Sequence, residues 1–593
     1  MKRFTKTVLG GLTLTLTLGL TLVGAGSSGA AVDLFQSPAG GNTDRFFGWS
    51  VSPAGDVNGD GFADFVVGAP FDAAKGAEAG RAFIWFGGPF MSDVPNVILD
   101  DGSAEDWFGF SVAGIGDIDD DGFDDVAVGA PGDDRNGLAK SGSVYVYLGR
   151  SEGQDETQLN WNVEQVVAGE VAGDRFGWSV SGAGDMDRDG IDDFVVGAPY
   201  NDATGTDRGR AYLFTGDRGD VATTPAVIWD GPAVAGPQST TRFANFAPDG
   251  TSIQGPGFGW VVADLGNFRG LNRAAIAIGA PGAAGAIGEV RLFVASAIAG
   301  TLPSTTPETV FGNSGQAGDA FGWSVASGGM IDGDARNDLL VGVPGDENGR
   351  GQVKIFYGSS DPPATDDVAS VVYQGQTTGD QFGYAVAGAG DHLGSPGTWL
   401  VGAPTRDDAG LDGGWVYVYD RTAQLPTNLL PRNRSGSAEA GDRWGFALCG
   451  LGDLDLDGSD EFLVGAPQAN DATSTRGLVG LISSDAGVVS VDTPEDEGLP
   501  LDDARLALRA ESIDSGDVEM RFSTGSDGPW SLRVFDVRGR VVTTLASGMG
   551  AVTERVVRFD GRDERGKLVA RGRYFVALDQ NGRRRADGFV HLR

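Results

Sequence analysis

One short unit recurs seven times along the chain, and this repetition constrains the fold more than any other feature of the sequence. Each copy begins with an aromatic residue followed by glycine and ends with Gly-Ala-Pro or a close variant. Successive copies start 61, 68, 82, 63, 61 and 62 residues apart, a period typical of proteins that stack one supersecondary unit repeatedly. The copies occupy residues 47–70, 108–131, 176–199, 258–281, 321–344, 382–404 and 444–467.

The pattern within each period predicts β-strands. In the first copy, "FGWSV" and "DFVVGA" are short and rich in aromatic and β-branched residues, and "RAFIWFG" and "NVILD" follow before the second copy. Four strands per period, seven times over, predict an all-β protein with a seven-bladed β-propeller. Because one four-stranded sheet cannot bury both of its faces, neighbouring blades must cover each other.

The two ends of the repeat region predict how the ring closes. A strand-like segment, "VDLFQS" (32–37), precedes the first copy without a blade of its own, and the seventh copy has no clear fourth strand. We therefore expect the N-terminal strand to complete the last blade.

The composition narrows the range of partners. The 593 residues include 82 Asp and Glu against 44 Lys and Arg, for a formal net charge of −38, yet 40% are hydrophobic and can build a core. Such an acidic chain argues against nucleic acid and anionic membranes as partners, because no basic patch neutralises phosphates. The single cysteine, Cys449, excludes an intramolecular disulfide.

The acidic residues gather in one loop of the repeat. Copies one, two, three and seven have oxygen-bearing side chains at loop positions 1, 3 and 5, glycine at 6 and a carboxylate at 9, the start of an EF-hand-like calcium loop. The carbonyl at position 7 can add a ligand. Hard oxygen ligands in an irregular loop suit Ca²⁺ better than Mg²⁺, so we predict about four structural calcium sites. The predicted ligands are Asp56, Asn58, Asp60, Phe62 and Asp64; Asp117, Asp119, Asp121, Phe123 and Asp125; Asp185, Asp187, Asp189, Ile191 and Asp193; and Asp453, Asp455, Asp457, Ser459 and Glu461.

The alternative is that these loops are solvated acidic turns, which Asp and Gly favour in any protein. Four loops with one spacing favour the metal interpretation. The other three copies depart from the pattern. Copy five keeps Asp332, Asp334 and Asp338 but has Met330 at position 1, so metal binding there stays open. Copies four and six are expected to be metal-free, since copy four has Arg269 at position 3 and the loop of copy six is one residue short.

The Phe-Gly…Gly-Ala-Pro unit with its embedded Asp-x-Asp-x-Asp-Gly loop resembles the FG-GAP repeat of the integrin α-subunit N-terminal β-propeller. The resemblance implies structural calcium hairpins on one face and loops for a macromolecular partner on the other. The ligand-facing loops would be those after each Gly-Ala-Pro, such as 132–142 and 200–210. The insertion at about 217–257, with Trp229, Phe243 and Phe246, would join them.

The two ends of the chain predict further domains. Residues 1–30 are typical of a signal peptide, since Lys2, Arg3 and Lys6 precede an apolar stretch and then small residues; an N-terminal membrane anchor is the alternative. We expect the propeller at 31–487, an acidic linker at 488–504 and a small Ig-like β-sandwich at 505–593. Residues 558–578 resemble the end of FlgD-type Ig-like domains and type IX secretion sorting tails. That resemblance implies a bacterial exported protein whose last domain directs export or surface attachment; a passive spacer is the alternative.

These observations favour a non-catalytic role. The chain has only two histidines, an isolated cysteine and no "GxSxG" motif, so no catalytic residues are predicted. We expect a secreted or cell-surface calcium-binding protein that mediates adhesion or binds an extracellular protein or glycan. A hydrolase that uses loop carboxylates and an architectural surface-layer component remain alternatives.

Overall fold

The computed structural model is built almost entirely of β-strands. Its described residues are 31–35, 46–88, 91, 94–150, 161, 163–233, 255–312, 315–360, 365–366, 368–392, 395–407, 412–421, 427–429, 441–455, 458–471, 474–475, 477–483, 507–512, 518–524, 529–536, 541–550, 552–562, 565–569, 572–580 and 583–591. The predicted signal peptide and acidic linker lie outside these residues. The helical elements of the described part are single turns, η1 (Arg135–Gly137), α1 (Ala283–Ala286) and α2 (Asp346–Gly349).

The repeats form a series of sheets of four strands each, one per copy, within the described residues; a short parallel strand, β23 (Thr365–Asp366), extends the fourth sheet. The first three sheets are β2 (Ser50–Gly55), β3 (Asp64–Ala69), β4 (Arg81–Trp85) and β5 (Val97–Leu99); β6 (Ser111–Gly116), β7 (Asp125–Ala130), β8 (Ser143–Tyr147) and β9 (Gln165–Ala168); and β10 (Ser179–Gly184), β11 (Asp193–Ala198), β12 (Arg210–Phe214) and β15 (Val227–Asp230).

The remaining sheets repeat the same antiparallel order. They are β16 (Val261–Asp264), β17 (Ala275–Ala280), β18 (Glu289–Val294) and β19 (Thr309–Phe311); β20 (Ser324–Ser327), β21 (Leu339–Val343), β22 (Gln352–Phe356) and β24 (Val371–Gln374); β25 (Ala385–Gly388), β28 (Trp399–Ala403), β29 (Trp415–Tyr419) and β30 (Thr427–Leu429); and β31 (Ala447–Gly452), β32 (Glu461–Ala466), β35 (Leu478–Ser483) and β1 (Ala31–Phe35). Short ribbons pair β13 (Gly216–Asp217) with β14 (Asp220–Val221), β26 (Asp391–His392) with β27 (Ser395–Pro396), and β33 (Asn470–Asp471) with β34 (Ser474–Thr475).

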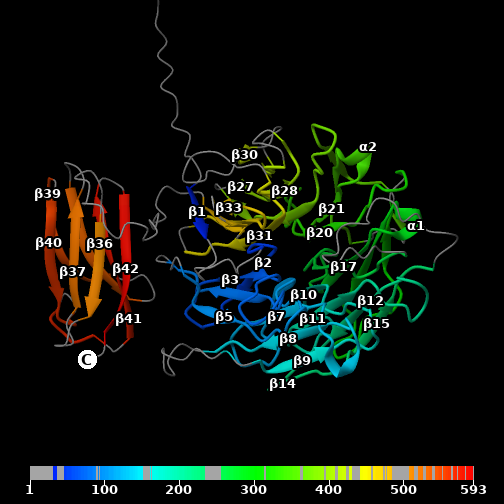
Figure 1. Cartoon of the computed structure of the whole chain (residues 1–593), viewed down its shortest axis with the longest axis horizontal. Coiled ribbons are helices and arrows are strands. Elements are labelled where there is room, and N and C mark those ends of the chain that lie inside the picture. Colours follow the sequence, from blue (N-terminus) through cyan, green and yellow to red (C-terminus); the bar gives the residue numbers. More distant parts are fainter. Residues whose placement is uncertain are drawn as a thin grey trace, which may run out of the picture.

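The sheets follow one another around a closed circle. Their first strands contact in chain order, from β2 through β6, β10, β16, β20 and β25 to β31, and β31 contacts β2. Figure 1 shows the colours running from blue through green to yellow around this body. The arrangement is consistent with a β-propeller, in which each sheet covers its neighbour.

The N-terminal strand completes the last sheet, as the sequence predicts. β1 pairs antiparallel with β35, from Ala31 opposite Ser483 to Phe35 opposite Val479, and Figure 1 places the blue β1 beside the yellow strands. The Phe35 side chain contacts Phe65 and Trp85 of the first sheet, with ring centroids 5.8 and 5.5 Å apart. Residues far apart in the sequence therefore join the first and last sheets.

The signature residues of the repeat make the contacts within and between sheets. In copy two, the Gly109 N–H donates to the Gly129 carbonyl oxygen at 3.1 Å, and Gly109 has the positive φ of 85° that favours glycine. A Cβ on Gly129 would lie 2.1 Å from the carbonyl oxygen of Gly177 in the next sheet, so this junction requires glycine. The Ser111 hydroxyl donates to the same oxygen at 2.9 Å.

The third residue of every copy is aromatic, and these side chains form a circle of their own. Neighbouring ring centroids lie 4.6 to 5.6 Å apart, with interplanar angles of 42° to 51°. We call this set the aromatic circle: Trp49, Phe110, Trp178, Trp260, Trp323, Tyr384 and Phe446, which contacts Trp49 again. Each member precedes the first strand of its sheet and each acidic loop follows that strand. The circle and the acidic loops therefore lie at opposite ends of these strands.

The C-terminal residues form two antiparallel sheets. One consists of β36 (Ala507–Ser512), β37 (Val518–Thr524) and β40 (Val552–Phe559), and the other of β39 (Val541–Met549), β38 (Pro529–Asp536), β41 (Gly572–Gln580) and β42 (Arg583–His591). Met520 and Phe522 of the first sheet share one buried core with Leu532 and Val576 of the second. Two sheets on one core agree with a small β-sandwich, and the Ig-like assignment stays a prediction.

Candidate metal centres

Each acidic loop joins the first two strands of its sheet and wraps around the carboxylate at position 1. In copy two, β6 ends at Gly116, where φ is 76° and the register against β7 shifts. Asp117 follows, and its two carboxylate oxygens accept the N–H groups of Asp121 and Gly122 at 3.0 and 2.9 Å. Asp56 and Asp185 accept the corresponding bonds from Asp60 and Gly61, and from Asp189 and Gly190.

The carboxylate at position 9 ties the loop to the third strand of the sheet. Asp125 is fully buried at the start of β7. Its Oδ2 accepts the Ile118 N–H at 2.9 Å, and its Oδ1 accepts the Gly149 N–H at 2.8 Å, just beyond β8. Each oxygen keeps a second lone pair that can face a cation. Asp64 and Asp193 make the same pairs of bonds, to Val57 and Gly87, and to Met186 and Gly216.

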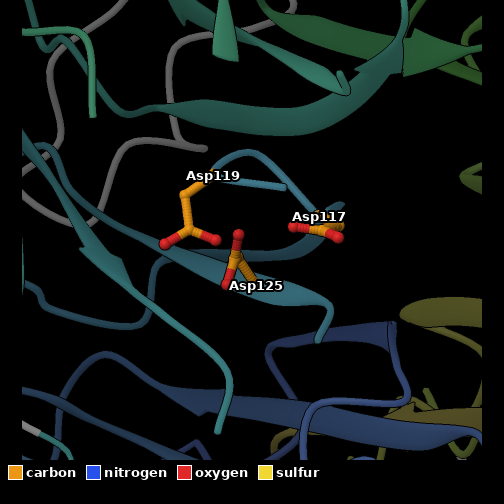
Figure 2. Close-up of side chains that lie close together, drawn as sticks. All are labelled: Asp117, Asp119 and Asp125. Atoms are coloured by element: carbon orange, nitrogen blue, oxygen red, sulfur yellow. The ribbon is translucent and has the colours of Figure 1, made fainter. Parts of the chain in front are cut away.

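Positions 1, 3 and 9 converge in three of the copies. One carboxylate oxygen from each of Asp117, Asp119 and Asp125 lies within 4.8 Å of the others, and Figure 2 shows the three side chains around a shared space. The same holds for Asp185, Asp187 and Asp193, and for Asp453, Asp455 and Glu461. Three oxygens at this separation can bind one hard cation such as Ca²⁺.

Asp119 gives an independent sign that a cation fits. Asp119 is 9% exposed, and its buried Oδ1 has no hydrogen-bond partner, although the Asp121 backbone N–H lies near enough to lower its pKa. Burial and the charges of Asp121 and Asp117 outweigh that effect and raise the pKa. A buried carboxylate oxygen without a partner is unfavourable, and a bound cation would remove this cost.

The protonation of the carboxyl at position 9 reflects its burial among other acidic side chains. Burial, together with nearby acidic side chains, raises the pKa of Asp125 to about 8 and that of Asp193 to about 7. Burial, with Asp60 and Asp56, raises the pKa of Asp64 to about 9. Without metal these buried groups favour their neutral form.

Other predicted ligands lie outside these groups. At position 5, Asp121 and Asp189 are exposed and do not belong to the sets of converging oxygens, and Asp457 lies outside the described residues. In copy one, Asn58 replaces the acidic residue at position 3; its Oδ1 accepts the Asp60 N–H at 2.8 Å and its Nδ2 donates to Asp60 Oδ2 at 3.2 Å. The position-7 carbonyls of Phe62, Phe123, Ile191 and Ser459 stay predictions.

The three divergent loops differ from these in their charges. In copy four, Arg269 at position 3 is buried and pairs with Glu308, with Nη2 2.7 Å from Oε1. In copy five, the guanidinium of Arg336 pairs with Asp334, one of the carboxylates that the pattern retains. In copy six, His392 is buried, with Nδ1 2.9 Å from the Asp460 carbonyl oxygen.

Sequence reasoning placed one residue wrongly and missed others. Trp229 was predicted to face a ligand, but it is 1% exposed in β15 and packs on Phe293, with ring centroids 4.7 Å apart. Phe243 and Phe246 lie outside the described residues. The aromatic circle was not predicted, although the aromatic third residue of every copy was a visible signal.

Comparisons with known proteins agree with the repeat. The FG-GAP repeat family model matches residues 47–85, 108–147 and 176–214. Integrin alpha-5 of Xenopus laevis is 36% identical over 177 residues, which are 28% of this chain and 16% of that protein. Integrin alpha-IIb of Homo sapiens is 38% identical over 161 residues, 26% of this chain and 15% of that protein. Integrin alpha-3 of Cricetulus griseus is 35% identical over 188 residues, 30% of this chain and 17% of that protein.

The matched segments thus span about one sixth of the length of these relatives. Among the described residues, no helix has the length and apolar character needed to cross a bilayer. The chain contains FG-GAP repeats and is homologous, over this part, to the N-terminal propeller region of integrin α subunits.

Proposed function

We propose that this protein is an extracellular, calcium-stabilised, seven-bladed β-propeller that binds a protein or glycan ligand without catalysis. The observation that carries the calcium part is the convergence of positions 1, 3 and 9, with the buried, unpartnered Oδ1 of Asp119 at one such group. The full predicted ligand set, including positions 5 and 7, belongs to this proposal.

The similarity to integrin α subunits supports the binding role. In this proposal the ligand site and the metal sites lie at opposite ends of the first strands. Calcium would hold the acidic end rigid. The ligand would bind at the other end, formed by the aromatic circle and the loops after each Gly-Ala-Pro. Tyr200, which starts one such loop, packs on Trp178 of the circle, with ring centroids 5.5 Å apart. Short loops on a rigid β-scaffold are a common design for recognition.

The ends of the chain complete the proposal. Residues 1–30 would direct export, and the C-terminal sandwich at 505–593 would support sorting or attachment at a bacterial surface. The shared core of its two sheets supports an independent domain. The test compares the location of the full chain with that of a chain truncated after residue 487. We expect the full chain to stay attached to the cell surface and the truncated chain to be released.

The binding role is tested with matched variants at the two ends. Thr206 is exposed in a loop at the aromatic end, and Thr301 is exposed beside the third acidic loop, where its N–H lies 3.2 Å from the Asp187 carbonyl oxygen. The exported full chain is applied to a glycan array and to surface-protein extracts with calcium present.

We expect Thr206→Arg to weaken capture of a ligand at least about tenfold, a loss of about 1.4 kcal/mol, and Thr301→Arg to leave it unchanged. Equal loss in both variants would contradict the assignment of the binding end. Hydrolysis of a polysaccharide on the array would instead favour the enzyme alternative.

A further inference from the structure

Each acidic loop is fastened to the sheet that follows it around the circle. In copy one, Asp124 Oδ2 of the second sheet accepts the Asp56 N–H at 2.7 Å, and the Arg150 N–H donates to the Val57 carbonyl oxygen at 2.8 Å. Such backbone bonds recur from Gly219 to Asp119 at 2.9 Å, from Gly300 to Asp187 at 2.7 Å and from Gly88 to Leu454 at 2.9 Å. The conformation of a loop therefore affects the junction between two sheets.

Copy four makes this junction with a side chain of its own. Arg269 occupies position 3, where the other loops have a ligand oxygen. Its Nη2 pairs with Glu308 of the same sheet at 2.7 Å, and its Nη1 donates to the Ser359 carbonyl oxygen of the next sheet at 3.1 Å. The Arg269 side chain is only 9% exposed and that of Glu308 34%, so this ion pair is screened less than one on the open surface. The positively charged side chain of Arg269 thus occupies the loop position where the other loops would have a metal ligand.

Copies five and six also join their neighbours through side chains. Arg336 pairs with Asp334 inside loop five, and the adjacent Asn337 Nδ2 donates to the Leu265 carbonyl oxygen of the fourth sheet at 2.9 Å. In copy six, His392 approaches the Asp460 carbonyl oxygen of the seventh sheet and packs on Phe462, with ring centroids 4.8 Å apart. These contacts require no metal.

We propose that the circle consists of a calcium-dependent arc and a metal-independent arc. Sheets seven, one, two and three are neighbours, contain all four calcium-type loops and include the β1–β35 closure. Arg269 and Asn337 maintain the junction between the fourth and fifth sheets, His392 maintains the one between the sixth and seventh, and Arg336 neutralises Asp334 inside loop five. This inference rests on the proposed calcium binding. Withdrawal of calcium loosens the first arc, including the closure, and leaves the second arc in place.

The test is hydrogen–deuterium exchange of the full chain with millimolar calcium and with excess EDTA. We expect exchange protection to fall at least about tenfold in residues 56–64, 117–125, 185–193 and 453–461 and in β1, and to remain in 267–275 and 332–338. If calcium binds but protection falls equally in all seven loops, the two-arc proposal is wrong and calcium binding stands. If calorimetry detects no calcium binding and EDTA changes nothing, the calcium proposal fails, and the inference fails with it.

Variants test the role of the arginine. Arg269→Met should raise exchange in residues 267–275 even with saturating calcium, whereas Arg350→Met, which removes an ion pair with Glu347 at the aromatic end, should not. If Arg269→Met fails to fold, Glu308→Gln removes the ion pair while the arginine stays and should give a smaller rise at the same loop. Unchanged exchange in Glu308→Gln and in any folded Arg269→Met protein would overturn the proposal.

Discussion

The first strands of the sheets have aromatic side chains at one end and acidic loops at the other. The two ends differ in how strictly their pattern is repeated from copy to copy. At one end an aromatic side chain is present in all seven copies, and each contacts the next. At the other end the acidic pattern is complete in four copies and replaced in three. A closed circle of apolar contacts needs every member, because a missing ring would leave a cavity shared by two neighbours. A metal loop is a local unit, so one copy can lose it when another side chain takes over the contact.

The strongest test of the circle is removal of its closing strand. Deletion of residues 31–35 takes away the β1–β35 pairing and the Phe35 contacts to Phe65 and Trp85. We expect the chain to lose its cooperative thermal transition, because β1 pairs with the last sheet and packs on the first, and both contacts are then absent. Phe35→Ala should give a milder effect of about 3–5 kcal/mol, since Phe35 is buried. An unchanged calorimetric transition in the deletion variant would show that β1 does not close the circle.

The acidic end should depend on both calcium and pH. Position-9 carboxyls with raised pKa values, such as Asp125 at about 8, bind more protons in the folded than in the unfolded chain between pH 3.8 and about 8. Without metal, stability therefore falls as pH rises through this window. Calcium stabilises the ionised form, so the Tm gap between calcium and EDTA should widen from pH 5.5 to pH 8. A gap that narrows with rising pH would contradict the assignment of these carboxyls.

The aromatic end should depend on its side chains and not on calcium. Trp178→Ala removes a ring that is 6% exposed and contacts both Phe110 and Trp260. We expect a loss of about 3–5 kcal/mol in the free energy of unfolding, equal with and without calcium. Trp178→Phe is the matched control and should cost less, because phenylalanine already stands in this position in two copies. A calcium-dependent loss would show that the two ends are coupled.

The smallest effect is expected at a single junction between sheets. The Ser179 hydroxyl donates to the Gly259 carbonyl oxygen at 2.9 Å, as Ser50, Ser111 and Ser324 do at their junctions. Ser179→Ala should cost about 1 kcal/mol in denaturant unfolding. Ser52→Ala, in a strand of the first sheet and bonded only to the neighbouring Pro53 carbonyl, is the control. Equal costs in both variants would show that the junction contact contributes nothing specific.

Local repetition made most of the fold predictable. The seven copies predicted four strands for each sheet, and the strand-like segment before the first copy predicted the closing strand, because both are patterns along the chain. Convergence of positions 1, 3 and 9 also follows from loop spacing. Trp229 was misplaced because an aromatic residue beside an insertion looks like a surface residue until its pairing in β15 buries it.

Contacts between copies could not be predicted from a single repeat. The Asp124 side chain of copy two accepts a hydrogen bond from the loop of copy one, and Arg269 donates one to the fifth sheet. Both contacts depend on how neighbouring sheets are placed around the circle, which the spacing within one copy does not specify.

Calcium stoichiometry tests the central claim most directly. Exported full-length protein is dialysed against metal-free buffer and titrated with calcium by calorimetry, with elemental analysis of the loaded protein. We predict about four calcium ions per chain, and one fewer in Asp119→Ala with the other sites retained. A chain that binds no calcium in either measurement, or an Asp119→Ala variant with the full number of ions, would contradict the account.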